Sequence, residues 1–179
     1  DDDEKAINSL QVFVFNKHDV FEASAYADEG EVSVTCTAGE KRIVALVNTI
    51  VDQSVATYQD LADTAVYLKD SGVGNLVMVG ETYAVVSSQT SVNVEVSYIS
   101  SKIVLESVVL DFEHEQHEGL TFSVESVYML NVAGDRKLID ASAPSVWHNK
   151  GQLDAEYVRL NVLYGKVASV ILQSGGAPY

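Results

Sequence analysis

Apolar and polar residues alternate with period two along most of the chain, the pattern of half-buried β-strands. Residues 42–48 instead form an almost unbroken apolar run, which is typical of a central strand covered on both faces. Turn-forming residues separate the alternating stretches, for example at 16–19 and 27–30. The strands predicted by alternation cover residues 10–15, 20–26, 31–37, 75–80, 82–87, 92–96, 102–112, 122–130, 157–163 and 166–172.

One segment departs from this period and predicts a helix. Thr57 is followed three residues later by Asp60, the spacing of a helix capping box. Apolar residues then recur at helical spacing from Leu61 to Leu68, and a glycine follows as a stop signal. We therefore expect a single helix over residues 58–69.

Many short strands with one helix favour a mostly β fold, an antiparallel β-sandwich. A parallel α/β fold would need helices between most strands, and the pattern does not provide them. A chain of 179 residues suits one ordinary domain, or one domain with an appended segment. We expect residues 1–153 to form the main sandwich domain, and residues 154–179 to be its last strands or the truncated start of a second domain.

The charge of the chain excludes two classes of partner. Eleven basic and 26 acidic residues give a formal net charge of −15. Nucleic-acid binding needs a basic face, and anionic membrane surfaces attract basic segments, so we expect neither partner. The sequence also has no apolar run near the roughly 20 residues of a membrane-spanning helix.

Candidate chemistry is sparse. Cys36 is the only cysteine, so neither an intrachain disulfide nor a cysteine-based zinc site can form, and its alternating context predicts a buried small side chain. His114 and His117 lie among carboxylates, but their spacing is one residue short of the zinc-protease motif. We therefore predict no catalytic, cofactor-binding or metal-binding residues, no cofactor and no enzyme activity.

Several blocks, in order, resemble the fimbrillin family, the type V pilins of Bacteroidia. The family's opening is an acidic stretch followed by an alternating strand, and its next block is a strand, an Ala-Gly turn and a second strand closing on Asn-Thr. The resemblance covers roughly residues 1–135. The matching blocks are residues 3–16, 35–49, the predicted helix near Leu61, 76–81, the strand before Asp111, and 122–131.

The resemblance implies a transthyretin-like β-sandwich of about seven strands. It also implies export as a lipoprotein precursor and removal of a leader, including the first strand, by an arginine-specific protease. Loss of that strand would leave a groove, which we expect beside the first retained strand. A donor strand from another fimbrial subunit would fill it by β-augmentation, building a fimbria attached to the outer membrane that supports adhesion.

Two questions stay open at this point: which kind of fimbrial subunit the chain would be, and whether it has a different function. Family members usually carry a second sandwich domain, for which we expect this chain to be too short, and the resemblance does not distinguish shaft, tip and anchor subunits. The other function is a non-polymerising cell-surface module that binds a glycan or a host protein through exposed aromatic residues such as Trp147, Tyr157 and Tyr164.

Overall fold

The computed structural model divides the chain into two compact units, each of which is considered by itself. The first unit comprises Asp1–Ser101 with Ala133–Trp147, and the second comprises Lys102–Val132 with His148–Tyr179. The predicted domain boundary at residue 153 stays a prediction. The structure describes residues 2–109, 113, 123–124, 129, 131–140, 142–148 and 172–173.

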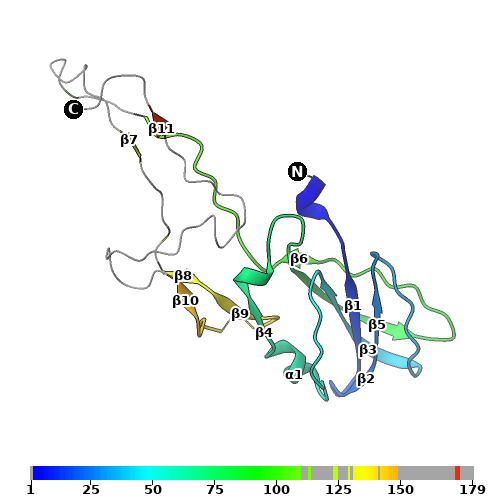
Figure 1. The fold of residues 1–179 in the computed structure, drawn as a ribbon. Helices are drawn as coiled ribbons and strands as arrows, with labels where there is room; N and C mark the ends of the chain where they lie inside the picture. The colour runs from blue at the N-terminus through cyan, green and yellow to red at the C-terminus, as the bar shows by residue number, and fades with distance from the viewer. Residues whose placement is uncertain are drawn as a thin grey trace. The chain divides into compact units, whose positions relative to one another are not determined.

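A five-stranded antiparallel sheet dominates the first unit (Figure 1), with the strand order β2-β1-β3-β5-β6. The predicted strands at 10–15 and 20–26 and the central strand at 42–48 are confirmed, whereas 75–80 and 82–87 merge into one long strand. The strands of this sheet are β1 (Leu10–Asn16), β2 (Phe21–Ala27), β3 (Gly39–Val47), β5 (Met78–Val86) and β6 (Ser97–Tyr98).

Shorter pairs complete the described strands, and all of the registers that can be followed are antiparallel. β4 (Ala65–Tyr67) pairs with β9 (Asp135–Lys137), and β8 (Val132–Ala133) pairs with β10 (Trp147–His148). In the second unit, β7 (Ser123–Val124) pairs with β11 (Leu172–Gln173). The fold is thus mostly β and antiparallel, with one short α-helix, as predicted for a β-sandwich. Two 3-10 turns, η1 (Asp2–Lys5) and η2 (Leu68–Asp70), are also present.

The sheet buries side chains on both faces, because β1 and β3 alternate between two apolar clusters. On one face, which we call the helix-side core, Phe13 and Phe15 pack with Val44 and with Leu61 of the helix. On the other face, the opposite core contains Leu10, Val12, Val14, Ile43, Ala45, Val47 and Met78.

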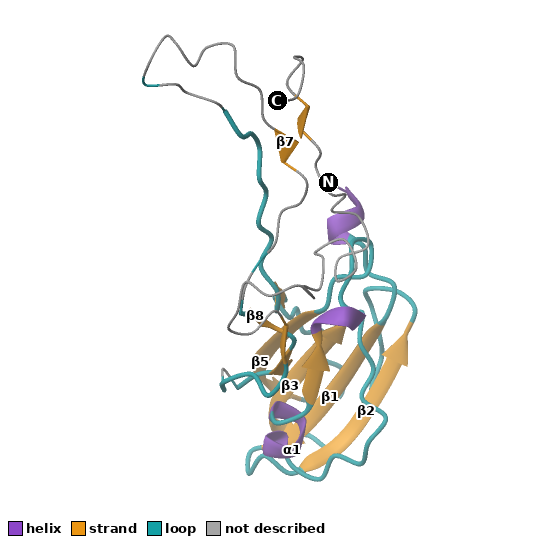
Figure 2. Cartoon of the chain, turned by 60° about the vertical axis from the view of Figure 1, so that its left-hand side comes forward, coloured by secondary structure: helices purple, strands orange, loops and turns teal. Residues whose placement is uncertain are grey.

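The helix, α1 (Tyr58–Ala62), lies at one end of the sheet (Figure 2) and is shorter than predicted. Its start is confirmed, because Thr57 and Asp60 form a reciprocal capping box. The prediction that it reaches residue 69 is wrong. Residues 65–67 form β4 instead, whose pairing with β9 overrides the weak helical spacing and turns Val66 into the core.

A buried asparagine closes β3. Asn48 has a φ of 60°, a left-handed conformation that asparagine tolerates better than most residues. Its side-chain oxygen accepts from the N–H of Asn8, while its amide donates to the carbonyls of Ala6 and Leu76. One side chain thus joins the N-terminal segment and the segment before β5 to the end of the central strand.

Three predicted strands do not form ladders. Segments 31–37 and 92–96 are extended but belong to no ladder. Residues 102–109, the described part of the predicted strand 102–112, form no strand and have exposed side chains. The predicted strand 157–163 lies outside the described residues, as do most of 122–130 and 166–172.

Candidate functional site: a sheet face covered by two unpaired segments

Two extended segments cover the opposite core. In segment 31–37 the half-buried side chains are Val32, Val34 and Cys36, and the intervening residues are exposed. Segment 91–96 repeats this alternation with Val92, Val94 and Val96. Both segments therefore behave as strands of a second layer, with an apolar face packed on the sheet and a polar face toward water.

The backbone of these segments is unpaired within the described part of the chain. Neither residues 31–37 nor residues 91–96 make a backbone–backbone hydrogen bond there. Thr37 alone has a side-chain partner for its N–H, the carboxylate of Glu22 at 3.4 Å. Extended backbone packed on a core is normally paired in a ladder, so these two segments retain the capacity to pair with a further strand.

A glycine allows segment 91–96 to cross the sheet. Gly80 of β5 lies opposite Ala45 of β3, so two small residues meet at this point. A Cβ at Gly80 would lie 2.8 Å from the carbonyl carbon of Glu95 and 3.0 Å from the Cα of Val96. The segment therefore passes directly over Gly80 and leaves the edge of β5, and only Met78 and Val79 keep their pairing with β6.

A buried ion pair ties segment 31–37 to the sheet. The ammonium of Lys41, whose side chain is 3% exposed, lies 2.8 Å from a carboxylate oxygen of Glu22. It also donates to the hydroxyl of Thr37 at 2.9 Å. The hydrogen bond from Lys41 is the largest influence that lowers the pKa of Glu22 below its ordinary value. The pair holds the end of the segment against β3 while the rest stays unpaired.

This arrangement can accept an extended peptide. An incoming strand would find unpaired N–H and C=O groups on two segments and an apolar surface beneath them. The acceptor surface formed by these two segments is not the groove that was predicted beside the first strand. β1 pairs along its length with β2 on one side and with β3 on the other, so it has no free edge.

The residues considered from the sequence do not converge on a catalytic centre in the described part of the chain. His114 and His117 lie outside the described residues, as do Tyr157 and Tyr164. Trp147 is 40% exposed, and Cys36 is half-buried with a free thiol. The described residues contain no group of three or more potential metal ligands. No described helix has the length and apolar character needed to cross a bilayer.

Sequence reasoning missed the unpaired state of these two segments and the role of Gly80. Alternation predicts which side chains face the core, but it does not say whether a neighbouring strand is present. The sequence signal for Gly80 was a glycine inside a strand pattern, which often marks a close backbone approach.

Comparison with known proteins gives a consistent picture. The model of a family described as major fimbrial subunit protein (FimA) matches residues 1–138. No curated protein matches the sequence significantly.

Three solved structures have a similar fold. A fimbrilin (FimA) from Porphyromonas gingivalis W83 has a TM-score of 0.57 at 15% identity, over 78% of this chain and 47% of that one. A candidate cell adhesion protein from Bacteroides eggerthii DSM 20697 has a TM-score of 0.54 at 21% identity, covering 75% and 46%. A fimbrial assembly protein from Parabacteroides distasonis ATCC 8503 has a TM-score of 0.54 at 16% identity, covering 81% and 64%. The chain thus spans about half to two thirds of the length of these proteins.

Proposed function

This chain belongs to the family of major fimbrial subunit (FimA) proteins, and from that premise we propose that it is a structural subunit completed by a strand from a neighbouring subunit. The family places its members in cell-surface fimbriae and points to a role in assembly and adhesion rather than in catalysis. The proposed partners are other fimbrial subunits.

One observation carries the proposal. Segments 31–37 and 91–96 pack on the opposite core through alternate side chains, yet neither forms a ladder in the described part of the chain. A donor strand would pair with this backbone and add apolar cover, so complementation would be driven both by hydrogen bonding and by burial. Because each subunit would donate to the next, the contact is heterologous and does not close, which produces a filament.

The remaining parts of the proposal concern the whole protein. We propose that the precursor is exported as a lipoprotein, that an arginine-specific protease removes a leader containing a strand, and that the mature fimbria is attached to the outer membrane. Removal of a strand by proteolysis would explain why two segments that cover one core have no backbone partner among the described residues. The net charge of −15 would keep subunits apart until a strand docks.

Polymerisation of the full-length protein tests the proposal. Treatment with an arginine-specific protease should produce a ladder of SDS-resistant oligomers on unboiled gels. The variant Val94→Asp introduces a charge at a half-buried position that faces the opposite core, and it should abolish the ladder. The control Asn93→Asp introduces the same negative charge at the exposed neighbouring position and should leave the ladder intact.

A mixing experiment distinguishes a subunit that can no longer accept a donor strand from one that no longer folds. A Val94→Asp subunit that is folded can still donate its own strand, so it should shorten wild-type polymers in proportion to its share of the mixture. Strictly monomeric protein after cleavage, or equal ladders from Val94→Asp and Asn93→Asp, would contradict strand complementation at this face.

A further inference from the structure

Segment 31–37, which we call the strap, is attached to the sheet by few contacts. Its backbone makes no backbone–backbone hydrogen bond in the described part of the chain. Its apolar contacts come from Val32, Val34 and Cys36, each of which is only half-buried on the opposite core. Regions with few buried contacts and no ladder hydrogen bonds open at a lower free energy than the whole fold. We therefore expect the strap to open while the sheet beneath it stays folded.

The strap lies between two glycines, one of which has the conformation and the space of a hinge. Gly30 precedes the strap, and Gly39 begins β3 shortly after it. Gly39 has a φ of 115°, a value that residues with a side chain rarely adopt, and a Cβ there would meet nothing within 4 Å. The backbone at Gly39 can therefore change its angles without a steric obstacle on that side.

One polar cluster, which we call the latch, closes the strap at its end. The hydroxyl of Thr37 lies 3.0 Å from both carboxylate oxygens of Glu22, and it accepts from the ammonium of Lys41 at 2.9 Å. Glu22 belongs to β2 and Lys41 to β3, so the latch joins the strap to two strands. Among the described residues, Thr37 is the one strap residue that makes hydrogen bonds.

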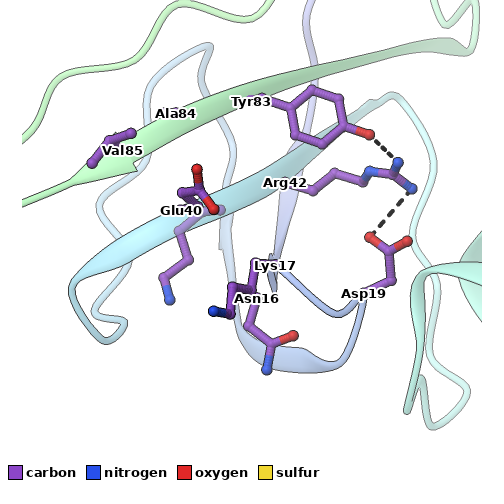
Figure 3. A pocket seen from close by; sticks show the side chains of 9 residues that line it. Asn16, Lys17, Asp19, Glu40, Arg42, Tyr83, Ala84 and Val85 are labelled. Carbon is purple, nitrogen blue, oxygen red and sulfur yellow. Dashed lines mark hydrogen bonds and ion pairs between the residues drawn. The ribbon is translucent and has the colours of Figure 1, made fainter.

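Glu22 serves the latch without competition from the next cation along β3. Successive side chains of a strand point to opposite faces, so Arg42 projects away from Lys41. There it bonds the hydroxyl of Tyr83 and lies 3.3 Å from a carboxylate oxygen of Asp19 (Figure 3). Each of the two cations thus has its own acidic partner, and Arg42 cannot replace a broken latch.

We infer that the strap opens as one unit while the sheet stays folded, and that the latch sets how often it opens. Val32, Val34 and Cys36 leave the opposite core together, because no ladder holds any of them separately. A strand that docks along the strap pairs with its backbone and favours the closed state. This last step rests on the proposed function, whereas the opening of the strap in a single subunit does not.

The reactivity of Cys36 toward iodoacetamide measures the opening in the unpolymerised full chain. Cys36 should react more slowly than in the urea-unfolded chain, but at least about tenfold faster than global unfolding allows. Amide exchange of Val44, inside the sheet, reports global unfolding. Low urea should accelerate the exchange of Val44 and hardly change the reactivity of Cys36, because local opening exposes little surface. Equal opening free energies and urea dependences for the two residues would overturn the inference.

Thr37→Val separates the strap from the latch and leaves the pair of Glu22 and Lys41 in place. Loss of the hydroxyl should increase the opening constant measured at Cys36 by about three- to tenfold. Each rate is divided by that of the same variant unfolded in urea. The control Thr35→Val makes the same chemical change at an exposed position outside the latch and should open like the wild type. Equal opening of the two variants would show that the latch does not hold the strap.

A thiol at the far end of the strap shows whether the strap opens as one unit. In the Cys36→Ser background, Val32→Cys moves the thiol to the end away from the latch. Adding Thr37→Val should accelerate its reaction by the same factor as that of Cys36. In the same background, a thiol introduced by Val94→Cys on segment 91–96 should not respond to Thr37→Val. An unchanged rate at position 32 would mean that only the latch end frays, which contradicts the inference.

The strap and the proposed function can fail separately. In SDS-resistant oligomers of the full-length protein, a docked strand should cancel the acceleration that Thr37→Val causes in the monomer. If the acceleration persists in the oligomers, the docked strand does not close the strap, and the last step of the inference is wrong. If the cleaved protein stays monomeric, strand complementation fails, while the measurements on the monomer still decide whether the strap opens.

Discussion

Gly80 is the residue at which the second layer depends most directly on the absence of a side chain. In Gly80→Ala, the new methyl group would overlap the carbonyl oxygen of Glu95, and it would lie 2.8 Å from the carbonyl carbon, whereas non-bonded carbon atoms are optimally about 3.5–4.0 Å apart. The backbone at Glu95 must therefore move by at least about 0.7 Å. No side-chain rotation can relieve the clash, because the atoms that the methyl group meets belong to the backbone.

We expect Gly80→Ala to lower the free energy of unfolding by about 2–3 kcal/mol, the upper part of the range for overpacking. Displacement of Glu95 also pulls Val94 and Val96 away from the opposite core, so their burial is lost together with the backbone contact. The measurement is urea-induced unfolding followed by circular dichroism, with the wild type under the same conditions.

Gly72→Ala is the matched control for this experiment. A Cβ at Gly72 meets nothing within 4 Å, and neither Gly72 nor Gly80 has a positive φ. Both substitutions therefore reduce the freedom of the unfolded chain equally, and the control should be neutral or stabilising by up to about 1 kcal/mol. If Gly80→Ala is as stable as Gly72→Ala within about 0.5 kcal/mol, segment 91–96 does not cross the sheet at Gly80.

Three further substitutions test local parts of the fold by thermal or urea unfolding. Thr57→Ala removes the capping box of α1 and should cost about 1 kcal/mol, with Thr57→Ser retaining most of it. Glu22→Gln replaces the carboxylate beside the buried ammonium of Lys41 by a neutral amide oxygen, so the ammonium loses its counter-charge, which should cost about 2 kcal/mol at neutral pH. Because the folded-state pKa of Glu22 is lowered, its contribution exists above the ordinary carboxyl pKa and disappears as the pH falls through the lowered value, so the stabilities of the wild type and of Glu22→Gln should converge in acid. Asn48→Ala loses three hydrogen bonds at a positive φ and should cost about 2–4 kcal/mol, whereas Asn48→Asp, which keeps only the acceptor, should fall between it and the wild type.

The sequence predicts those parts of the fold whose signals are local. Apart from Gln11 and Asn16, β1 is apolar at every position, so its place inside the sheet follows from its own residues. The start of α1 follows from the Thr57–Asp60 pair. The end of α1 does not, because residues 65–67 pair with β9, about seventy positions away, and local helical spacing carries no information on that partner.

The candidate site divides in the same way. Alternation in segments 31–37 and 92–96 correctly indicates which valines face the core. The alternation gives no information on strand pairing, because side chains and backbone hydrogen bonds point in perpendicular directions in a sheet. The outer edge of β5 at Tyr83, which has no paired strand among the described residues, could not be predicted for the same reason, because it begins where segment 91–96 crosses Gly80. Local sequence thus indicates which side chains face a core, while the pairing of a strand's edges depends on residues far away in the sequence.

The one thiol of the molecule sits where it can report on occupancy. Cys36 is half-buried in segment 31–37, next to the backbone that is proposed to receive a strand. Docking of a strand there would restrict access to its sulfur, whereas binding elsewhere would not. The rate at which a small maleimide alkylates Cys36 thus measures the fraction of subunits that hold a donor strand, and it requires no engineered label.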